Sequence, residues 1–228
     1  MKRFVLLVVC GACLSWVASA DPCTSGSLAD YEGLATGCTI GTNLLSGFTT
    51  LSGISGATPI DPGTVSITPS GGSATPELLF TVSNTADAND LLEAIFTYKI
   101  SGNPYTHSTI TLSNSSETGD GAVTDIQNTC ADGSFGPDGV SGCTGTAGSL
   151  VALDGIQNAD DTPLAALSFL NVTDDFTLDG GTAGSATGGS FTDQFAAGVT
   201  VPEPKAVSFF AAFVLALAAI CRRRSIKI

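Results

Sequence analysis

The chain contains few basic residues, and this shortage removes two classes of partner. Twenty of its 21 acids lie between positions 21 and 198, together with only one of its eight Lys and Arg residues, Lys99, so that this segment has a formal charge of −19. Nucleic acids and anionic lipid surfaces are bound by Lys and Arg side chains that displace counterions. The composition therefore argues against both and is typical of an acidic extracellular protein.

Histidine and tryptophan are equally scarce. His107 is the only imidazole, and no G-x-S-x-G motif occurs, so a Ser-His-Asp site would depend on this one residue. Trp16 is the only tryptophan and lies in the apolar N-terminal segment. The candidates for stacking against a sugar ring are therefore Tyr31, Tyr98 and Tyr105, of which Tyr105 is the main one. We expect no catalytic residues.

Cysteine occurs seven times, but three copies lie in the apolar segments at the two ends. The four that remain are Cys23, Cys38, Cys130 and Cys143. No C-x-x-C spacing exists among these four and one histidine is present, which argues against zinc, whereas an even number of cysteines fits disulfides in an oxidising exterior. Three pairings are open; the local scheme, 23 with 38 and 130 with 143, would close two short loops worth about 2–4 kcal/mol each.

The first twenty residues have the pattern of a signal peptide. Lys2 and Arg3 precede an apolar run over positions 4–17, and Ala18-Ser19-Ala20 supplies the small residues that signal peptidase recognises. We expect cleavage before Asp21 and export across the inner membrane.

The C-terminal end has three parts: Val201-Pro202-Glu203-Pro204, the uncharged run 206–221, and Arg222-Arg223-Arg224 within the basic tail 222–228. The two prolines favour an extended segment that the following helix cannot absorb. A helix over 206–221 would reach about 24 Å, slightly short of a hydrocarbon core of about 30 Å. The arginines predict that this end stays in the cytoplasm.

This order resembles the PEP-CTERM sorting region of bacterial exosortase substrates, over positions 199–228. The resemblance implies processing by an exosortase at the motif 201–204, transient single-pass anchoring, and a place at the cell surface or in the extracellular polysaccharide matrix of a biofilm. A permanent anchor is the alternative. The Cys-bounded start of the exported segment, the stretch 64–80 and the second cysteine pair also look like a β-rich ectodomain found with such tails.

Alternating apolar and polar residues predict short strands through the exported segment, which we take as one domain over 21–198. The expected strands are 64–67, 77–82, 90–100, 108–112, 121–127, 149–154, 164–170, 176–178 and 191–195. Turn residues separate them at 69–72, 84–87 and 101–104, and 180–190 is expected to be a flexible loop. With a short helix near Ser27–Leu34, the pattern predicts an all-β antiparallel sandwich, immunoglobulin-like or jelly-roll.

Acidic residues are too numerous to identify a site by themselves. Asp160-Asp161 and Asp174-Asp175 are adjacent pairs, which on a strand point to opposite faces, so neither predicts the facing carboxylates of a glycosidase. Oxygen donors gather at 84–90 and 154–161, and calcium is the one metal to consider there, although neither stretch matches an EF-hand loop. We expect no resident cofactor or metal.

The functional prediction is an exported, surface-routed structural or matrix-associated protein that is not an enzyme. Its expected partners are signal peptidase, an exosortase and extracellular polysaccharide, with the membrane contacted through the C-terminal helix. A carbohydrate-binding or adhesive module is the alternative. A secreted hydrolase that uses acidic residues ranks third.

Overall fold

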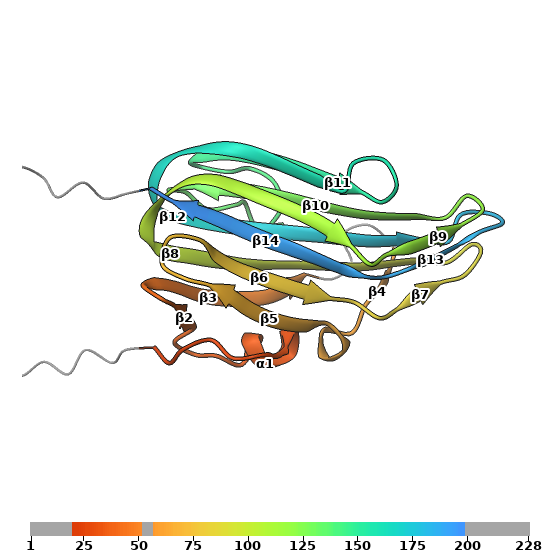
Figure 1. The fold of residues 1–228 in the computed structure, drawn as a ribbon, viewed down its shortest axis with the longest axis horizontal. Helices are drawn as coiled ribbons and strands as arrows, with labels where there is room; N and C mark the ends of the chain where they lie inside the picture. Colours follow the sequence, from red (N-terminus) through yellow and green to blue (C-terminus); the bar gives the residue numbers. More distant parts are fainter. Residues whose placement is uncertain (1–19, 52–56, 199–228) are drawn as a thin grey trace, which may run out of the picture.

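A long antiparallel pair of strands, β8 (Leu91–Ser113) and β12 (Ala159–Asp179), runs through the centre of the fold (Figure 1). The computed structural model describes residues 20–51 and 57–198. The other strands of this part of the chain are β1 (Gly26–Ser27), β2 (Cys38–Ile40), β3 (Asn43–Leu51), β4 (Thr58–Pro59), β5 (Ser66–Gly71), β6 (Pro76–Thr81), β7 (Thr85–Ala86), β9 (Ser116–Thr118), β10 (Ala122–Ala131), β11 (Thr146–Leu153), β13 (Ser185–Thr187) and β14 (Ser190–Ala197).

Each half of β8 has a different neighbour on its outer edge. Strand β3 pairs with positions 95–101 and β14 pairs with positions 105–113, while β10 pairs with the second half of β12. The order β1-β5-β6-β14-β8-β12-β10-β11 is antiparallel throughout, and only the two-residue β4 pairs with β8 in parallel among the ladders described. The register of β12 against β8 shifts between Pro163 and Phe169, near the change of neighbour. The long pair is therefore shared by two halves of one sheet. One half contains β3, the first part of β8, the second part of β12 and β10; the other contains β14, the second part of β8 and the first part of β12.

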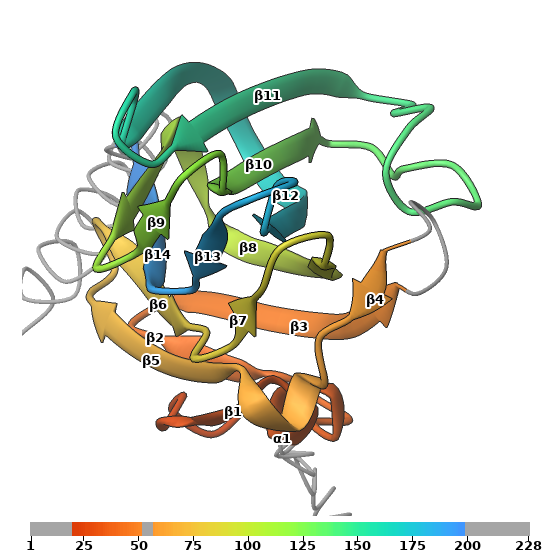
Figure 2. The ribbon, with the colours of Figure 1, turned by 90° about the vertical axis from the view of Figure 1, so that its right-hand side faces the viewer.

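Aromatic side chains join these two halves across the core. Phe96 of β8 lies 4.9 Å from Phe80 of β6, and Phe176 of β12 lies 5.2 Å from Phe191 of β14, measured between ring centroids. All four are fully buried. Such pairs contribute about 0.5–1.5 kcal/mol each beyond the area they bury. The halves thus face each other as two layers with the aromatic residues between them; Figure 2 shows the ribbon from the end of the molecule.

The N-terminal segment covers one edge with helix α1 (Leu28–Glu32), against which the 3-10 turn η1 (Pro62–Thr64) packs from its place after β4 in the chain. Ser27 caps the helix: its hydroxyl accepts from the Asp30 backbone N–H, and the Asp30 carboxylate accepts from the Ser27 N–H. This capping box satisfies two amides at the start of the helix. Buried Tyr31 then packs edge-on against Phe48 of β3, 5.0 Å away, so the helix is fixed to the sheet.

A second, small sheet of β7, β13 and β9 closes the far end of the molecule, at the right of Figure 1. Strand β13 lies inside 180–190, where we predicted a flexible loop, and that prediction is wrong. Glycine and small polar residues leave the segment without a hydrophobic pattern, but Asp120 accepts hydrogen bonds from the backbone amides of Thr182 and Ala183 and holds it in place.

The all-β antiparallel architecture and the short helix near Ser27 are confirmed. The predicted turn at 101–104 is wrong, because β8 continues through it with Gly102 at φ 122°. Strand β3 was not predicted, since Ser46-Gly47 interrupts its alternation. The expected signal peptide, except for Ala20, and the expected membrane helix 206–221 lie outside the described residues. Within 20–51 and 57–198, the structure contains no helix long and apolar enough to cross a membrane.

Candidate functional site

Lys99, the single basic side chain of residues 20–51 and 57–198 apart from His107, lies on the outer face of the sheet. On β8 it is in register with Ser46 of β3 on one side and with Asn171 of β12 on the other. Because side chains alternate along a strand, Lys99 points away from the core, into which its neighbour Tyr98 is buried. The three outward residues form a short polar row across three strands.

The loop between β10 and β11 forms a wall beside this row. The disulfide Cys130–Cys143 closes the loop, the Asn171 amide donates to the Gly133 carbonyl at 2.5 Å, and the Thr173 hydroxyl donates to the Gly139 carbonyl at 2.6 Å. The cavity between the row and the loop has a volume of about 310 Å³. We call it the Lys99 groove, lined chiefly by Ser46, Lys99, Ser134, Phe135, Gly139 and Asn171.

Residues in the groove and beside it make or offer three kinds of contact. The Lys99 ammonium lies 4.0 Å from the centroid of the Phe169 ring, a cation–π contact. Phe135 is half-buried and offers an aromatic side chain, while Ser46, Ser134 and Asn171 offer hydroxyl and amide groups. Apolar surface with a few polar groups that fix orientation is the usual make-up of a small-ligand site.

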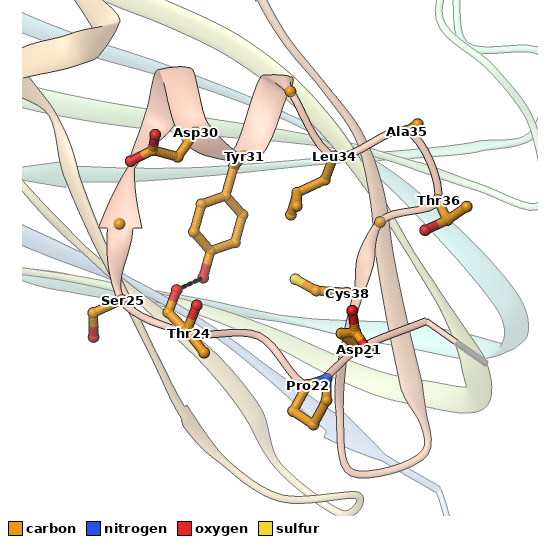
Figure 3. A pocket seen from close by; sticks show the side chains of 13 residues that line it. Asp21, Pro22, Thr24, Ser25, Asp30, Tyr31, Leu34, Ala35, Thr36 and Cys38 are labelled. Carbon is orange, nitrogen blue, oxygen red and sulfur yellow. Dashed lines mark hydrogen bonds between the residues drawn. The ribbon is translucent and has the colours of Figure 1, made fainter. Parts of the chain in front are cut away.

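A larger cavity, of about 540 Å³, lies beside α1 (Figure 3). The Tyr31 hydroxyl donates to the Thr24 carbonyl at 2.9 Å in its wall, and burial raises the pKa of Tyr31 to about 12. Asp30 accepts hydrogen bonds from Ser27, mainly from its backbone amide, and these lower the pKa of the Asp30 carboxyl. The Tyr31 hydroxyl and the Asp30 carboxylate are therefore engaged in holding the N-terminal segment together.

Three aspartates meet inside the core: Asp125 of β10, Asp174 of β12 and Asp193 of β14. Each is fully buried, and one carboxylate oxygen from each lies within 4.8 Å of the others. The Tyr98 hydroxyl donates to Asp193 Oδ2 at 2.5 Å. The other five carboxylate oxygens have no hydrogen-bond donor among the described residues. We call these three residues the aspartate cluster.

The cluster is electrostatically unusual. Burial, followed by the neighbouring Asp193 charge, raises the pKa values of Asp125 and Asp174 well above that of an ordinary aspartate. Burial also raises the pKa of Asp193 to about 6, although the hydrogen bond from Tyr98 opposes the shift. A buried carboxylate without a partner is costly, so the cluster requires either protons or a cation.

The residues considered for catalysis do not come together. His107 is exposed on β8, whereas Ser108 points into the core and donates to Gln127 Oε1 at 2.5 Å. Asp174 is buried and Asp175, the next residue, is half-buried on the opposite face of β12, as the alternation predicts. Asp160 instead accepts from the backbone amide of Val151.

The tyrosines proposed for sugar stacking are buried. Tyr31 and Tyr98 are buried in the core, and Tyr105 is fully buried with its hydroxyl donating to Asn43 Oδ1 at 2.9 Å. The rings of Tyr105 and Tyr98 are therefore not available for stacking against a sugar, although Tyr98 is among the residues that border the Lys99 groove. Aromatic residues on short alternating strands fill the core first, because their area is the largest available for burial.

The cysteine pairs form as the local scheme predicts, Cys23 with Cys38 and Cys130 with Cys143, and both fit an oxidising compartment. Neither oxygen-rich stretch, 84–90 or 154–161, contributes to the one group of three converging acids found in the described part of the chain. Ala18, the sorting motif 201–204 and the basic stop 222–224 lie outside that part.

Comparisons with known proteins identify no family. No protein-family model matches the chain, and no curated protein does. Among solved structures, the chain is similar to TmCBM61 in complex with beta-1,4-galactotriose, with a TM-score of 0.26 and 9% identity over 57% of this chain and 86% of that one. It is also similar to the enzymatically active domain of bacteriophage CBA120 tailspike protein 4, with a TM-score of 0.24 and 11% identity over 68% of this chain and 19% of that one.

Proposed function

We propose that this protein is an exported, non-catalytic component of a bacterial cell surface or extracellular matrix, processed by an exosortase at positions 201–204. The observation that carries the proposal is the pair of disulfides bracing an all-β scaffold with twenty acids and one lysine between positions 21 and 198. Small exported domains use such bridges for stability outside the cell. We place the scaffold among β-sandwiches, immunoglobulin-like or jelly-roll.

The test is the intact mass of the protein recovered from outside the cells, compared with that in the membrane fraction. We expect a chain that starts at Asp21 and ends near the 201–204 motif. Reduction is expected to add about 4 Da, two hydrogens for each disulfide. A mass that still includes Arg222-Arg223-Arg224 would identify a permanent single-pass anchor and overturn the sorting proposal.

The Lys99 groove favours a second, compatible function, which is binding of a saccharide from the surrounding matrix. Phe135 supplies a half-buried ring, and Lys99, Ser46 and Asn171 supply donors on one face. A strongly anionic saccharide would be repelled by the acids of the exported segment. We therefore propose a neutral sugar, bound by ring contact and hydrogen bonds.

Binding of neutral matrix polysaccharide to the exported protein, measured by calorimetry, tests this second function. Phe135→Ala and Lys99→Gln should each weaken a saturable binding curve by about tenfold, the loss of roughly one good contact. Ile156→Ala, which alters a side chain that is 80% exposed and outside the groove, is the matched control and should bind as the wild type does. Equal binding by the wild type and all three variants would show that the Lys99 groove does not bind the saccharide.

A further inference from the structure

We propose that the aspartate cluster is a buried calcium site, in which Asp125, Asp174 and Asp193 bind one ion between the two layers of the fold. The proposal does not rest on the protein's export or on the Lys99 groove. It follows from where the three side chains lie, from which of their atoms lack donors, and from the absence of a neutralising base among the residues that the structure describes.

The three strands bring the carboxylates together from both layers. Asp174 is directly opposite Gln127 in the pairing of β12 with β10, and Asp125 is two residues from Gln127 on the same inward face. Asp193 approaches from β14, which is paired with the second half of β8. An ion at this point would link β10, β12 and β14, strands that Figure 1 shows along the length of the molecule.

The charge of the cluster has no protein counterion in the described chain. Lys99 follows Tyr98 on β8 and therefore points to the opposite face of the sheet, towards Phe169. His107 is exposed. Tyr98 orients Asp193 through its hydroxyl but carries no charge. Three fully buried carboxylates with five donor-free oxygens consequently need a cation, unless protons neutralise them.

Gln127 provides a second, independent indication of a ligand. This side chain is fully buried, and its Nε2 has no hydrogen-bond acceptor by geometry, although it faces the carboxyl groups of Asp174 and Asp193. Its Oε1 accepts from Ser108. Rotating the side-chain amide by a half-turn exchanges Oε1 and Nε2 and leaves the shape of the side chain nearly unchanged. In the reversed orientation, Nε2 donates to Ser108 and Oε1 becomes a fourth oxygen ligand aimed into the cluster.

The donor set selects a hard cation, and its dimensions fit calcium. All donors are oxygens, and calcium binds oxygen ligands at about 2.3–2.6 Å, so two ligands on opposite sides of the ion lie about 4.6–5.2 Å apart. One carboxylate oxygen from each of the three aspartates lies within 4.8 Å of the other two. Magnesium requires closer octahedral ligands and keeps several waters.

The competing state is a cluster neutralised by protons, in which a proton is shared between Asp174 and Asp193. Metal content and thermal stability of the exported protein, produced from the full chain, distinguish the calcium-bound cluster from the protonated one. The protein is unfolded in denaturant in the presence of a chelator and then refolded with calcium, with magnesium, or without divalent metal. We expect one calcium per chain, and a midpoint that rises by about 5–10 °C when free calcium is a hundredfold above its Kd.

Two variants locate the ion. Asp174→Asn should lose the bound calcium and the calcium-dependent rise, whereas Asp161→Asn, which changes an exposed acid on the same strand, should keep both. Wild-type protein that refolds without calcium and melts at one temperature in all three solutions would overturn the proposal. A rise of equal size in Asp174→Asn would place the ion elsewhere and overturn it as well. Retention of magnesium alone would overturn the choice of calcium. If Asp174→Asn does not fold, the wild-type metal content and melting still decide.

Discussion

At the scale of single residues, the buried aspartates couple stability to pH in the calcium-free protein. A carboxyl whose pKa is higher in the folded chain binds protons more tightly there, so low pH favours the folded state. For Asp193, with a pKa of about 6 in place of 3.8, the contribution is complete below about pH 4 and is lost as the pH rises through about 6. Asp125 and Asp174 add to the loss, because burial raises their pKa values as well.

Denaturant unfolding from pH 4 to pH 8 after metal removal measures this loss. Asp175 titrates in the same window, since burial and then Glu93 raise its pKa to about 6, so the slope of the wild type contains Asp175 as well as the three aspartates of the cluster. Asp193→Asn removes one of these groups and should make the curve shallower. Asp120 acts in the opposite direction and at lower pH, because hydrogen bonds, first from Thr182, lower its pKa to about 2. An Asp193→Asn curve parallel to that of the wild type would show that Asp193 does not titrate in this range.

The aspartate cluster was missed by sequence reasoning, although each strand carries a signal for it. Asp193 stands between Phe191 and Phe195 at the apolar phase of its strand, and Asp174 stands between Val172 and Phe176 in the same way. A carboxylate in register with core residues must be buried if the strand alternates. What sequence could not supply is the meeting of β10, β12 and β14, which depends on the order of strands in the sheet.

At the scale of elements, the continuity of β8 depends on Gly102. Its φ of 122° lies in the left-handed region, and an added Cβ would collide with the Thr42 carbonyl oxygen. Gly102→Ala should therefore destabilise the protein by at least about 1–3 kcal/mol, the usual range for a strained backbone residue. Gly72→Ala is the control, since a Cβ there would meet no atom within 4 Å, and it should stay within about 0.5 kcal/mol of the wild type. Equal unfolding midpoints for the two variants would show that Gly102 is not strained.

The same residue explains an error at this scale. Ser101-Gly102-Asn103-Pro104 has the composition of a turn, and local composition correctly predicts a break in regular backbone there. The chain nevertheless continues in one direction. Strand β3 pairs with the half of β8 that precedes Gly102, and β14 pairs with the half that follows it, so both halves have a partner. Period-two alternation thus predicted seven of the fourteen strands described, but it could not reveal that two pairs of the predicted segments are continuous.

The two disulfides allow a matched comparison of elements. They close loops of similar length, with sequence separations of 15 and 13, so removing either should cost about 3 kcal/mol in the loop-entropy account. Only Cys130–Cys143 braces the wall of the Lys99 groove. We expect the double alanine variant of this pair to lose saccharide binding and that of Cys23–Cys38 to keep it, at a temperature where both are folded. If both double alanine variants lost saccharide binding, or if both kept it, binding would not depend specifically on the loop that Cys130–Cys143 closes.

At the scale of the whole molecule, the excess of acids determines how salt acts. Repulsion among twenty acids opposes the compact state, and its range falls from about 30 Å at 0.01 M salt to about 10 Å at 0.1 M. Thermal melting in sodium chloride should therefore show a midpoint that rises over this interval.

Affinity for a neutral saccharide should change by less than about twofold over the same interval, since no long-range charge term enters. An anionic saccharide would instead bind more tightly as salt screens the repulsion. A steep gain in affinity with salt would thus identify an acidic ligand and contradict the neutral one. In that case Lys99→Gln, which removes the only lysine of the exported segment, should make the gain steeper still.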